Sequence, residues 1–561
     1  MNSNKSKNNY KQVYHANIPE AWSNDPNGMI WYDGKAHLFC QYYPHKPQWG
    51  PMHWGHFVSK DFVKWEFLPT ALTPDQTYEA ICGCCSGSSI EIDGKLWIMY
   101  TAAQPELQRQ CLAWSDDGVH FTKLSENPVL TADMLKDIVS PRDFRDPKLF
   151  RKGEYYYCLA GIRVIDPESY RNRINNIKKY DTKDEASYYK DIFPMDIRDL
   201  NPSRGLSPDV SLNFSLGVNA ALTGAVSGQV NPSDDETIQV LGGDEGAIGK
   251  GNLVLFRTKD LKDWEFCGVL LHEQEELDPA FFELNGVYEC PDYFKLGDKE
   301  IILASPQNLP QIGHRFQNLH SVIYMTGQLN FENGEFHIDE IEDLDSGFDI
   351  YASQTLETPD HRRILIAWKE MWDRSYPTES SNWVGTYTLP RELDYHDGHL
   401  YQIPVREIEA CRAGKVEADQ LQLSPDGLSI PGIEGNVLEL TAEISMEDAV
   451  KAGIKLFKGA EHETLITYDK ENGTVSFDRT KSGIPLKGKE ADCNVRICQV
   501  GSMDKISFRI FLDVMSAEVF INGGRYVMTG NMYPDPEDRG IEFFSDGNAI
   551  LEKVVKYDIV V

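Results

Sequence analysis

The chain has 561 residues, of which 41% are hydrophobic and 11% aromatic. This length exceeds one ordinary hydrophobic core and favours two or more domains, while the aromatic side chains favour β-strands. The formal net charge of −32 argues against binding to nucleic acid or to an anionic membrane, because both ligands are negatively charged.

The start of the chain, MNSNK, is polar and lacks the apolar core of a signal peptide. No run reaches about 18 uninterrupted apolar residues, so no membrane span is expected. The 11 cysteines are scattered, and without a secretion signal free thiols are the simplest interpretation. We therefore expect a cytoplasmic protein.

The segment Asn24-Asp25-Pro26-Asn27-Gly28 predicts a stiff turn that holds one carboxylate. Proline fixes its own φ and restricts Asp25 before it, and Asn27-Gly28 suits a tight reversal with positive φ. A carboxylate held between tryptophans suits the nucleophile of a site that cleaves glycosidic bonds. The alternative is an ordinary surface turn, since both dipeptides are common in turns.

Two further carboxylates stand beside prolines, Asp146 in the segment FRDPK and Glu289 in the segment ECPD. Glycosidic cleavage with retention uses two carboxyl groups about 5–5.5 Å apart, one as nucleophile and one as acid and then base. A third carboxylate can hold substrate hydroxyls. Each of the three can instead be a salt-bridged or capping residue, which is the commoner fate of Asp and Glu.

A tight turn followed by an apolar strand recurs five times. Gly34, Gly94 and Gly153 occupy the first three turns, 60 and 59 residues apart, and looser copies follow at Gly297 and His361. A second element repeats out of phase at 59–67, 115–121 and 258–266. Five all-β units with a regular period predict a five-bladed β-propeller.

The third unit is interrupted at about residues 162–251, an excess of about 84 residues over one period. This insertion either covers the mouth of the propeller or makes a contact in a homo-oligomer, or it is a peripheral excursion. From about residue 408 apolar and polar residues alternate, with a hairpin at Asn472-Gly473, which predicts a β-sandwich. The expected domains are thus 1–400 and 401–561.

Seven blocks of the sequence resemble, in the same order, the signature of glycoside hydrolase family 32, which contains invertases, sucrose-6-phosphate hydrolases, inulinases and levanases. The resemblance covers residues 22–393 and continues more weakly to the chain end. The blocks are NDPNG (24–28), QYY with QWGPMHWGH (41–56), SGS (86–88), FRDPK (144–148), ECPD (289–292), DIYASQ (349–354) and TLPREL (388–393). The resemblance implies the same propeller and sandwich.

The resemblance also implies roles for the three carboxylates. Asp25 would be the nucleophile, Glu289 the acid and then the base, with a proton affinity raised by negative neighbours and partial burial, and Asp146 would bind ring hydroxyls. The substrate-binding residues that it implies are Asn24, Gln41, Trp49, Ser86, Arg145 and Tyr351. Trp54 and Trp368 either pack against this pocket or belong to the core.

Three positions depart from the family pattern. Cys85 stands where a phenylalanine usually precedes the Ser-Gly-Ser block, and Ile350 and Ser353 replace a phenylalanine and a proline. These changes leave the carboxylates intact and put the pocket wall in doubt, and with it the preference for the leaving group.

We expect no metal and no cofactor. The cysteine cluster at residues 82–85 has no second pair of ligands to complete a zinc site. His53 and His56 would point to opposite faces of a strand, so they cannot share an ion.

The leading hypothesis is a retaining β-fructofuranosidase that acts on sucrose, sucrose 6-phosphate or short fructans. One alternative is a fructosyltransferase, in which a sugar replaces water as the acceptor. Another is a catalytically inactive fructan-binding propeller, against which the presence of all three carboxylates argues.

Overall fold

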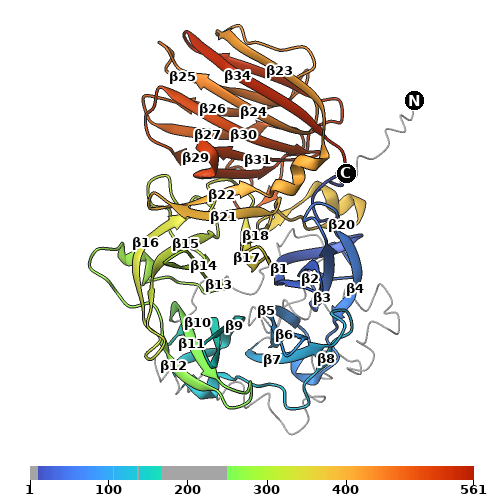
Figure 1. The fold of residues 1–561 in the computed structure, drawn as a ribbon, viewed down its shortest axis with the longest axis vertical. Helices are drawn as coiled ribbons and strands as arrows, with labels where there is room; N and C mark the ends of the chain where they lie inside the picture. Colours follow the sequence, from blue (N-terminus) through green and yellow to red (C-terminus); the bar gives the residue numbers. More distant parts are fainter. Residues whose placement is uncertain (1–9, 105, 136–137, 166–248) are drawn as a thin grey trace, which may run out of the picture.

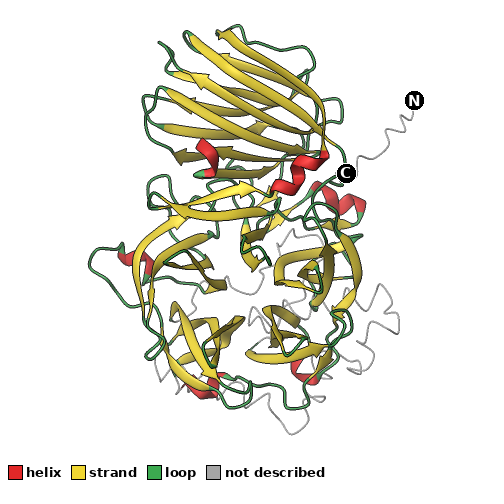
Figure 2. Ribbon diagram, in the orientation of Figure 1, coloured by secondary structure: helices red, strands yellow, loops and turns green. Residues whose placement is uncertain are grey.

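The computed structural model describes residues 10–104, 106–135, 138–165 and 249–561. They form a ring of five sheets followed by two packed sheets (Figure 1), which confirms the predicted propeller and sandwich. The helices of these residues are short 3-10 turns (Figure 2), none of them long and apolar enough to cross a membrane. They are η1 (Thr77–Glu79), η2 (Ala132–Leu135), η5 (Pro279–Phe281), η6 (Pro377–Ser381), η7 (Arg406–Cys411) and η8 (Asn522–Gly524).

Each of the five sheets is one blade with four antiparallel strands in chain order. Blade 1 contains β1 (Ala21–Tyr32), β2 (Lys35–Tyr43), β3 (His53–Ser59) and β4 (Glu66–Leu72). Blade 2 contains β5 (Gly83–Ile92), β6 (Lys95–Gln104), β7 (Leu107–Ser115) and β8 (Thr122–Lys123). Blade 3 contains β9 (Val139–Lys152), β10 (Tyr155–Val164), β11 (Lys250–Thr258) and β12 (Glu265–Val269).

Blade 4 contains β13 (Tyr288–Leu296), β14 (Lys299–Pro306), β15 (Ile323–Leu329) and β16 (Phe336–Asp343), and blade 5 contains β17 (Tyr351–Glu357), β18 (Arg363–Trp368), β21 (Arg391–His396) and β22 (His399–Pro404). The first strands β1, β5, β9, β13 and β17 contact one another in a closed ring, so they surround the axis. The ring is closed by β20 (Trp383–Val384), which pairs in parallel with β1.

The two repeated sequence elements mark the same loops in successive blades. The turn that contains Gly34, Gly94, Gly153, Gly297 or His361 joins the first strand of a blade to the second, and all five residues have positive φ. The second element joins the third strand to the fourth, and in each copy one aspartate accepts backbone N–H bonds from the following residues: Asp61, Asp117 and Asp260.

The predicted turn at residues 24–28 is wrong, because these residues lie inside β1. The register between β1 and β2 shifts between Ser23 and Pro26 and again between Asn27 and Ile30. Pro26 is tolerated there because a bulge interrupts the hydrogen-bond ladder. Gly28 does adopt positive φ, +53°, but within a bulged strand rather than in a chain reversal.

Most of the predicted insertion lies outside the described residues. Its two ends belong to blade 3, where Ile162 of β10 pairs with Asn252 of β11 and Val164 with Lys250. The predicted division at residue 400 falls within β22, and as a statement about domains it stays a prediction.

The C-terminal unit packs a six-stranded sheet, in the order β23-β34-β24-β30-β31-β32, on a five-stranded sheet, β29-β27-β26-β25-β33. Alternate apolar side chains such as Leu440, Ile454, Phe477 and Val519 fill the space between the two sheets. The six strands are β23 (Arg412–Leu423), β34 (Ala549–Ile559), β24 (Val437–Ser445), β30 (Lys505–Asp513), β31 (Ser516–Ile521) and β32 (Tyr526–Asn531). The five are β29 (Val495–Gln499), β27 (Thr474–Lys481), β26 (Glu463–Asp469), β25 (Lys451–Lys458) and β33 (Gly540–Ser545).

The short strands β19 (Arg374–Ser375) and β28 (Lys487–Gly488) pair between the two units. The predicted hairpin at Asn472-Gly473 is confirmed between β26 and β27, where Gly473 has a φ of +63°.

Buried ion pairs join the sandwich to the propeller. Arg391 of blade 5 is fully buried, and its guanidinium contacts Glu518 at 2.7 Å and Asp345 at 3.1 Å. Both ring nitrogens of His15 face carboxylates, Asp513 at 2.7 Å and Glu518 at 2.9 Å. Because Asp513 and Glu518 belong to the sandwich, these charges hold the two units against each other.

Arg391→Met is expected to lower the free energy of unfolding by about 3–5 kcal/mol, because it removes the buried cation that pairs with both Asp345 and Glu518. Urea unfolding followed by fluorescence measures the loss. Arg406→Met is the control, since its ion pair with Asp360 is exposed and is worth less than about 1 kcal/mol. Equal effects of the two substitutions would contradict this account of the junction.

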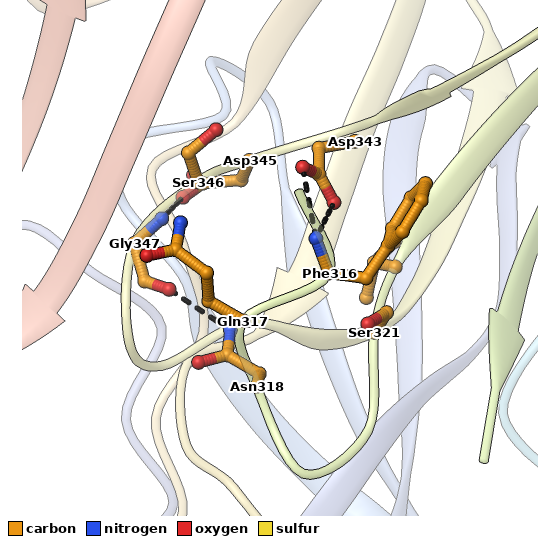
Figure 3. Close-up of a pocket in the computed structure, with 9 residues that line it drawn as sticks. Phe316, Gln317, Asn318, Ser321, Asp343, Asp345, Ser346 and Gly347 are labelled. Atoms are coloured by element: carbon orange, nitrogen blue, oxygen red, sulfur yellow. Dashed lines mark hydrogen bonds between the residues drawn. The ribbon is translucent and has the colours of Figure 1, made fainter. Parts of the chain in front are cut away.

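A small pocket is lined by residues of the β14–β15 connection and of the segment that follows β16 (Figure 3). The carboxylate of Asp343 accepts a hydrogen bond from the Phe316 backbone N–H at 3.2 Å, and burial raises the pKa of Asp343 to about 7. A larger cavity of about 300 Å³ shares Asp343 and extends to Arg525 and Tyr526 of the sandwich. The two units therefore pack through their ion pairs and leave this larger cavity between them.

Candidate active site

The innermost strand of every blade is bulged, and the predicted site residues other than Gln41 and Trp49 lie in or next to these bulges. Two residues oppose a single residue of the neighbouring strand at 24–25 in β1, 146–147 in β9, 290–291 in β13 and 352–353 in β17, and residue 86 of β5 has no residue opposite it. Bulges re-aim side chains that a regular strand would turn to alternate faces. Asp146 and Cys290 also adopt positive φ, +60° and +47°, which is strained for residues other than glycine.

The contacts of Cys290 show that the carboxylates lie close together at the propeller axis. Its Sγ lies 3.5 Å from Asp25 Oδ2 and 3.7 Å from Asp146 Oδ2, and its backbone N–H donates to the same Asp146 oxygen at 3.0 Å. Glu289 is the preceding residue. The structure thus brings together Asp25, Asp146 and Glu289 from blades 1, 3 and 4, each of them at least nine-tenths buried.

Asp25 is held by neutral hydrogen-bond donors. Its Oδ2 accepts from Ser86 Oγ at 2.7 Å and from Gln41 Nε2 at 2.8 Å, and its Oδ1 accepts from Asn24 Nδ2 at 3.0 Å. Burial raises the pKa of Asp25, and these hydrogen bonds together with the Cys290 thiol oppose the rise by stabilising the anion. The carboxylate is therefore fixed in orientation by neutral donors, and no described residue forms an ion pair with it.

Glu289 lies between a guanidinium and a phenol. Its Oε1 accepts from Arg145 Nη1 at 2.9 Å and its Oε2 accepts from the Tyr351 hydroxyl at 2.6 Å. Burial raises the pKa of Glu289 to about 8, while Arg145 acts against the rise and the negative charges of Asp146 and Asp25 add to it. The direction agrees with the raised proton affinity expected from the sequence.

Asp146 is buried beside Arg145 and Asp25. Burial raises the pKa of Asp146 to about 6, Arg145 lowers it, and the charge of Asp25 raises it. Two carboxyl groups whose pKa values are driven apart suit separate roles as acid and as anion. The arrangement can therefore present a protonated acid, Glu289, and two oriented carboxylates, Asp25 and Asp146, to one small polar substrate.

Comparison with known proteins is consistent with this geometry. A model of the N-terminal domain of the family 32 glycosyl hydrolases matches residues 15–203 and 229–404, and a model of the family's C-terminal domain matches residues 407–559. The chain belongs to glycoside hydrolase family 32. It is similar to the sucrose-6-phosphate hydrolase of Zymomonas mobilis, with 30% identity over 97% of this chain and 91% of that protein.

Two solved structures extend the comparison. A mutant of the Bombyx mori family 32 β-fructofuranosidase, in complex with sucrose, has a TM-score of 0.70 and 28% identity, covering 98% of this chain and 94% of that one. The sucrose-6-phosphate hydrolase of Lactobacillus gasseri has a TM-score of 0.74 over 99% of this chain and 94% of that one, and its 24% identity shows a shared fold. The chain is thus a family 32 enzyme over essentially its whole length.

A cluster of tryptophans packs beside the site of this family 32 enzyme. Trp22 donates from its indole N–H to Asn24 at 2.8 Å, and its ring lies 6.0 Å from Trp372 and 6.2 Å from Trp368. Trp49 is half-buried and packs against the same cluster, which also contains Cys290 and Tyr351. By contrast, Trp54 is fully buried among core residues.

The three departures from the family pattern lie at buried positions. Cys85 is 7% exposed and precedes Ser86, the donor to Asp25. Ile350 is buried in the cluster that contains Tyr351, and Ser353 lies in the β17 bulge. All three departures are therefore buried next to residues of the site.

Cys290, Trp372 and Asp143 are residues of the site that the sequence did not single out. Cys290 directly follows Glu289 in the ECPD block, and this position is the sequence signal that could have placed it in the site. Asp143 precedes FRDPK by one residue and binds Arg145 at 2.7 Å. Trp372 gave no local signal, since tryptophans are equally common in cores.

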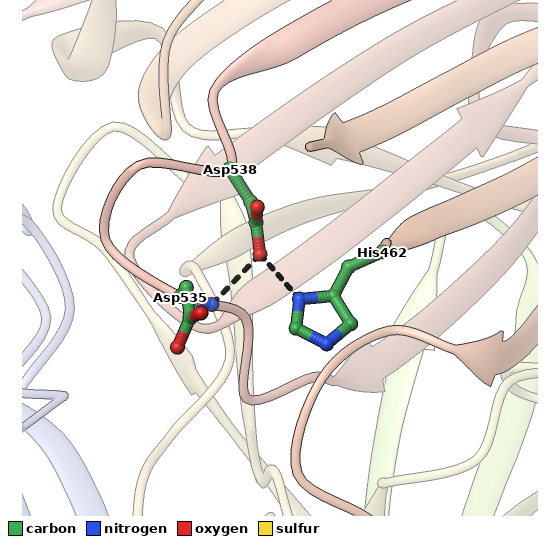
Figure 4. Close-up of side chains that lie close together, drawn as sticks. All are labelled: His462, Asp535 and Asp538. Atoms are coloured by element: carbon green, nitrogen blue, oxygen red, sulfur yellow. Dashed lines mark hydrogen bonds and ion pairs between the residues drawn. The ribbon is translucent and has the colours of Figure 1, made fainter. Parts of the chain in front are cut away.

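The described residues contain one group with the composition of a metal site, His462, Asp535 and Asp538 (Figure 4). It lies in loops of the sandwich, and His462 Nδ1 is already paired with Asp538 at 2.7 Å. His53 and His56 have separate partners, the Pro51 carbonyl and His37. All 11 cysteines are free thiols, as predicted.

Proposed function

We propose that this family 32 enzyme is a retaining β-fructofuranosidase, which releases terminal β-D-fructofuranosyl units from sucrose, sucrose 6-phosphate or short fructans. The observation that supports it is the meeting of Asp25, Asp146 and Glu289 at the propeller axis in different electrostatic surroundings. The similarity to the sucrose-6-phosphate hydrolase of Zymomonas mobilis and to the Bombyx mori enzyme in complex with sucrose supports a fructosyl substrate.

In the first step, Asp25 attacks the anomeric carbon of the fructosyl unit while Glu289 protonates the departing glycosidic oxygen. A fructosyl ester of Asp25 forms and the C–O bond to the leaving sugar breaks. In the second step, Glu289 takes a proton from water, which displaces Asp25 and releases fructose. The donors that hold Asp25 also stabilise it as a leaving group.

Asp146 would accept hydrogen bonds from ring hydroxyls and stabilise the positive charge that develops on the sugar. Arg145 would balance the charge of the carboxylates. Of the remaining predicted pocket residues, three donate hydrogen bonds to Asp25, namely Asn24, Gln41 and Ser86. Tyr351 donates one to Glu289. Trp49 would offer the sugar an apolar face.

A substrate panel tests the proposal: sucrose, sucrose 6-phosphate, 1-kestose, inulin and levan, with free fructose as the product measured. Analysis for larger oligosaccharides separates hydrolysis from fructosyl transfer. With methanol as acceptor, a retaining enzyme gives the β-methyl fructoside. No fructose from any member of the panel would reject the function, and the α-methyl product would reject retention.

The pH dependence of kcat/KM for sucrose is expected to show a basic limb. Glu289 must carry a proton to act as the acid, so activity should fall as the pH rises through about 8, the raised pKa of that group. Initial rates between pH 5 and 10 measure the limb. A profile that stays flat to pH 10 would contradict the assignment of the acid to Glu289.

A further inference from the structure

Three buried residues share the guanidinium of Arg145. Nη1 donates to Glu289 Oε1 at 2.9 Å, Nη2 donates to Asp143 Oδ1 at 2.7 Å, and Nε donates to Gln108 Oε1 at 3.1 Å. The donors of a guanidinium lie in a rigid plane. Holding two edges of that plane therefore fixes the position of the third nitrogen, the one that faces Glu289.

Asp143 also binds this guanidinium, and the proposed mechanism gives it no role. It is 4% exposed, and its second oxygen lies 3.4 Å from Arg163 Nε. Arg163, Arg145 and the nearby Arg142 hold the pKa of Asp143 below its ordinary value, against the effect of burial. Asp143 is therefore a fixed negative charge, and its hydrogen bonds reach Glu289 only through Arg145.

We propose that Asp143 is a positioning residue, which draws part of the charge of Arg145 away from Glu289 and so keeps Glu289 able to carry the proton for the leaving group. In the absence of Asp143, more of the guanidinium's charge would act on Glu289 and favour its anion. The inference rests on the proposed role of Glu289 as the acid.

The other groups that face Glu289 come from different strands and stay in place when Asp143 is changed. They are a hydroxyl, a thiol and two carboxylates, on Tyr351, Cys290, Asp25 and Asp146. Removing the negative charge of Asp143 lowers the pKa of Glu289 both directly and through Arg145. Because the two effects have the same sign, the direction of the expected change does not depend on their sizes.

Asp143→Asn is expected to move the basic limb of kcat/KM for sucrose to lower pH by about 0.5–1 unit. It should also lower kcat about 10- to 100-fold through the loosened guanidinium. The position of the limb does not depend on how much folded enzyme a preparation contains, so lost stability alone cannot imitate the shift. An unmoved limb with normal kcat would overturn the proposal.

Gln108→Glu is a second and opposite variant. A carboxylate at the Nε edge would draw Arg145 away from Glu289, so the limb should move to higher pH. This variant keeps the proposal testable should Asp143→Asn fail to fold. A shift of the limb to lower pH in Gln108→Glu would contradict the coupling through Arg145.

Asp345→Asn is the matched control, because Asp345 is also a buried carboxylate paired with an arginine, Arg391, but lies at the junction with the sandwich. It should lower stability and leave the limb where it is. The wild-type limb is assigned separately with Glu289→Gln. A limb that persists in that variant would refute the role of Glu289, whereas a limb lost there and unmoved in Asp143→Asn refutes only the present inference.

Discussion

Asp25→Asn is expected to lower kcat on sucrose by at least about 10⁴-fold, because the amide cannot form the fructosyl ester on which both steps depend. The structure gives a second expectation for the same variant. Burial raises the pKa of Asp25, so the folded protein holds its anion at an energetic disadvantage at neutral pH. A neutral side chain of the same shape removes that disadvantage, and the melting temperature should be unchanged or higher.

Kinetics and thermal unfolding on one preparation check both expectations. Asp33→Asn is the control, because Asp33 lies in the turn of the same β1–β2 hairpin, is exposed and has a φ of +47°, which asparagine tolerates. It should keep wild-type kinetics. Sucrose hydrolysis at an undiminished rate in Asp25→Asn would remove Asp25 from the mechanism, and a large fall in melting temperature would make the activity loss uninformative about chemistry.

The blades were predictable because their signals are local. A tight turn needs positive φ at one or two positions, and Asp33-Gly34 and Asp93-Gly94 supply it at the start of the second strand. The regular spacing of these turns along the chain then gives the number of blades. The same local chemistry failed at residues 24–28, since a proline and an Asn-Gly pair suit a bulge as well as a turn, and the choice depends on the strand alongside.

The candidate site was predictable only as a set of residue types. The resemblance named Asp25, Asp146 and Glu289, while nothing in their spacing showed that five bulges gather them. Contacts such as Cys290 with Asp25 span 265 residues. Arg391 and Glu518 are 127 residues apart, and His15 and Asp513 are 498 apart. The sequence alone does not distinguish a charged residue at the surface from one in a buried pair.

Glu289→Ala is the second substitution with a large expected effect, and its consequence depends on the leaving group. On sucrose, kcat should fall by about 10²–10⁴-fold, the usual contribution of general acid catalysis. With fructosyl fluoride, whose leaving group needs no proton, the first step should survive and the fructosyl ester of Asp25 should accumulate. A rapid burst of fluoride followed by slow turnover is the expected time course.

Azide supplies the decisive measurement on the same variant. It is a nucleophile that needs no base, so it should restore turnover of fructosyl fluoride in Glu289→Ala and yield a fructosyl azide, but should not restore Asp25→Asn by the same route. Glu300→Gln, a buried glutamate on the neighbouring strand β14, is the control and should behave as wild type. If azide had no effect on Glu289→Ala while sucrose cleavage stayed near normal, another residue would have to donate the proton. The 2.9 Å and 2.6 Å contacts of Glu289 with Arg145 and Tyr351 would then be structural.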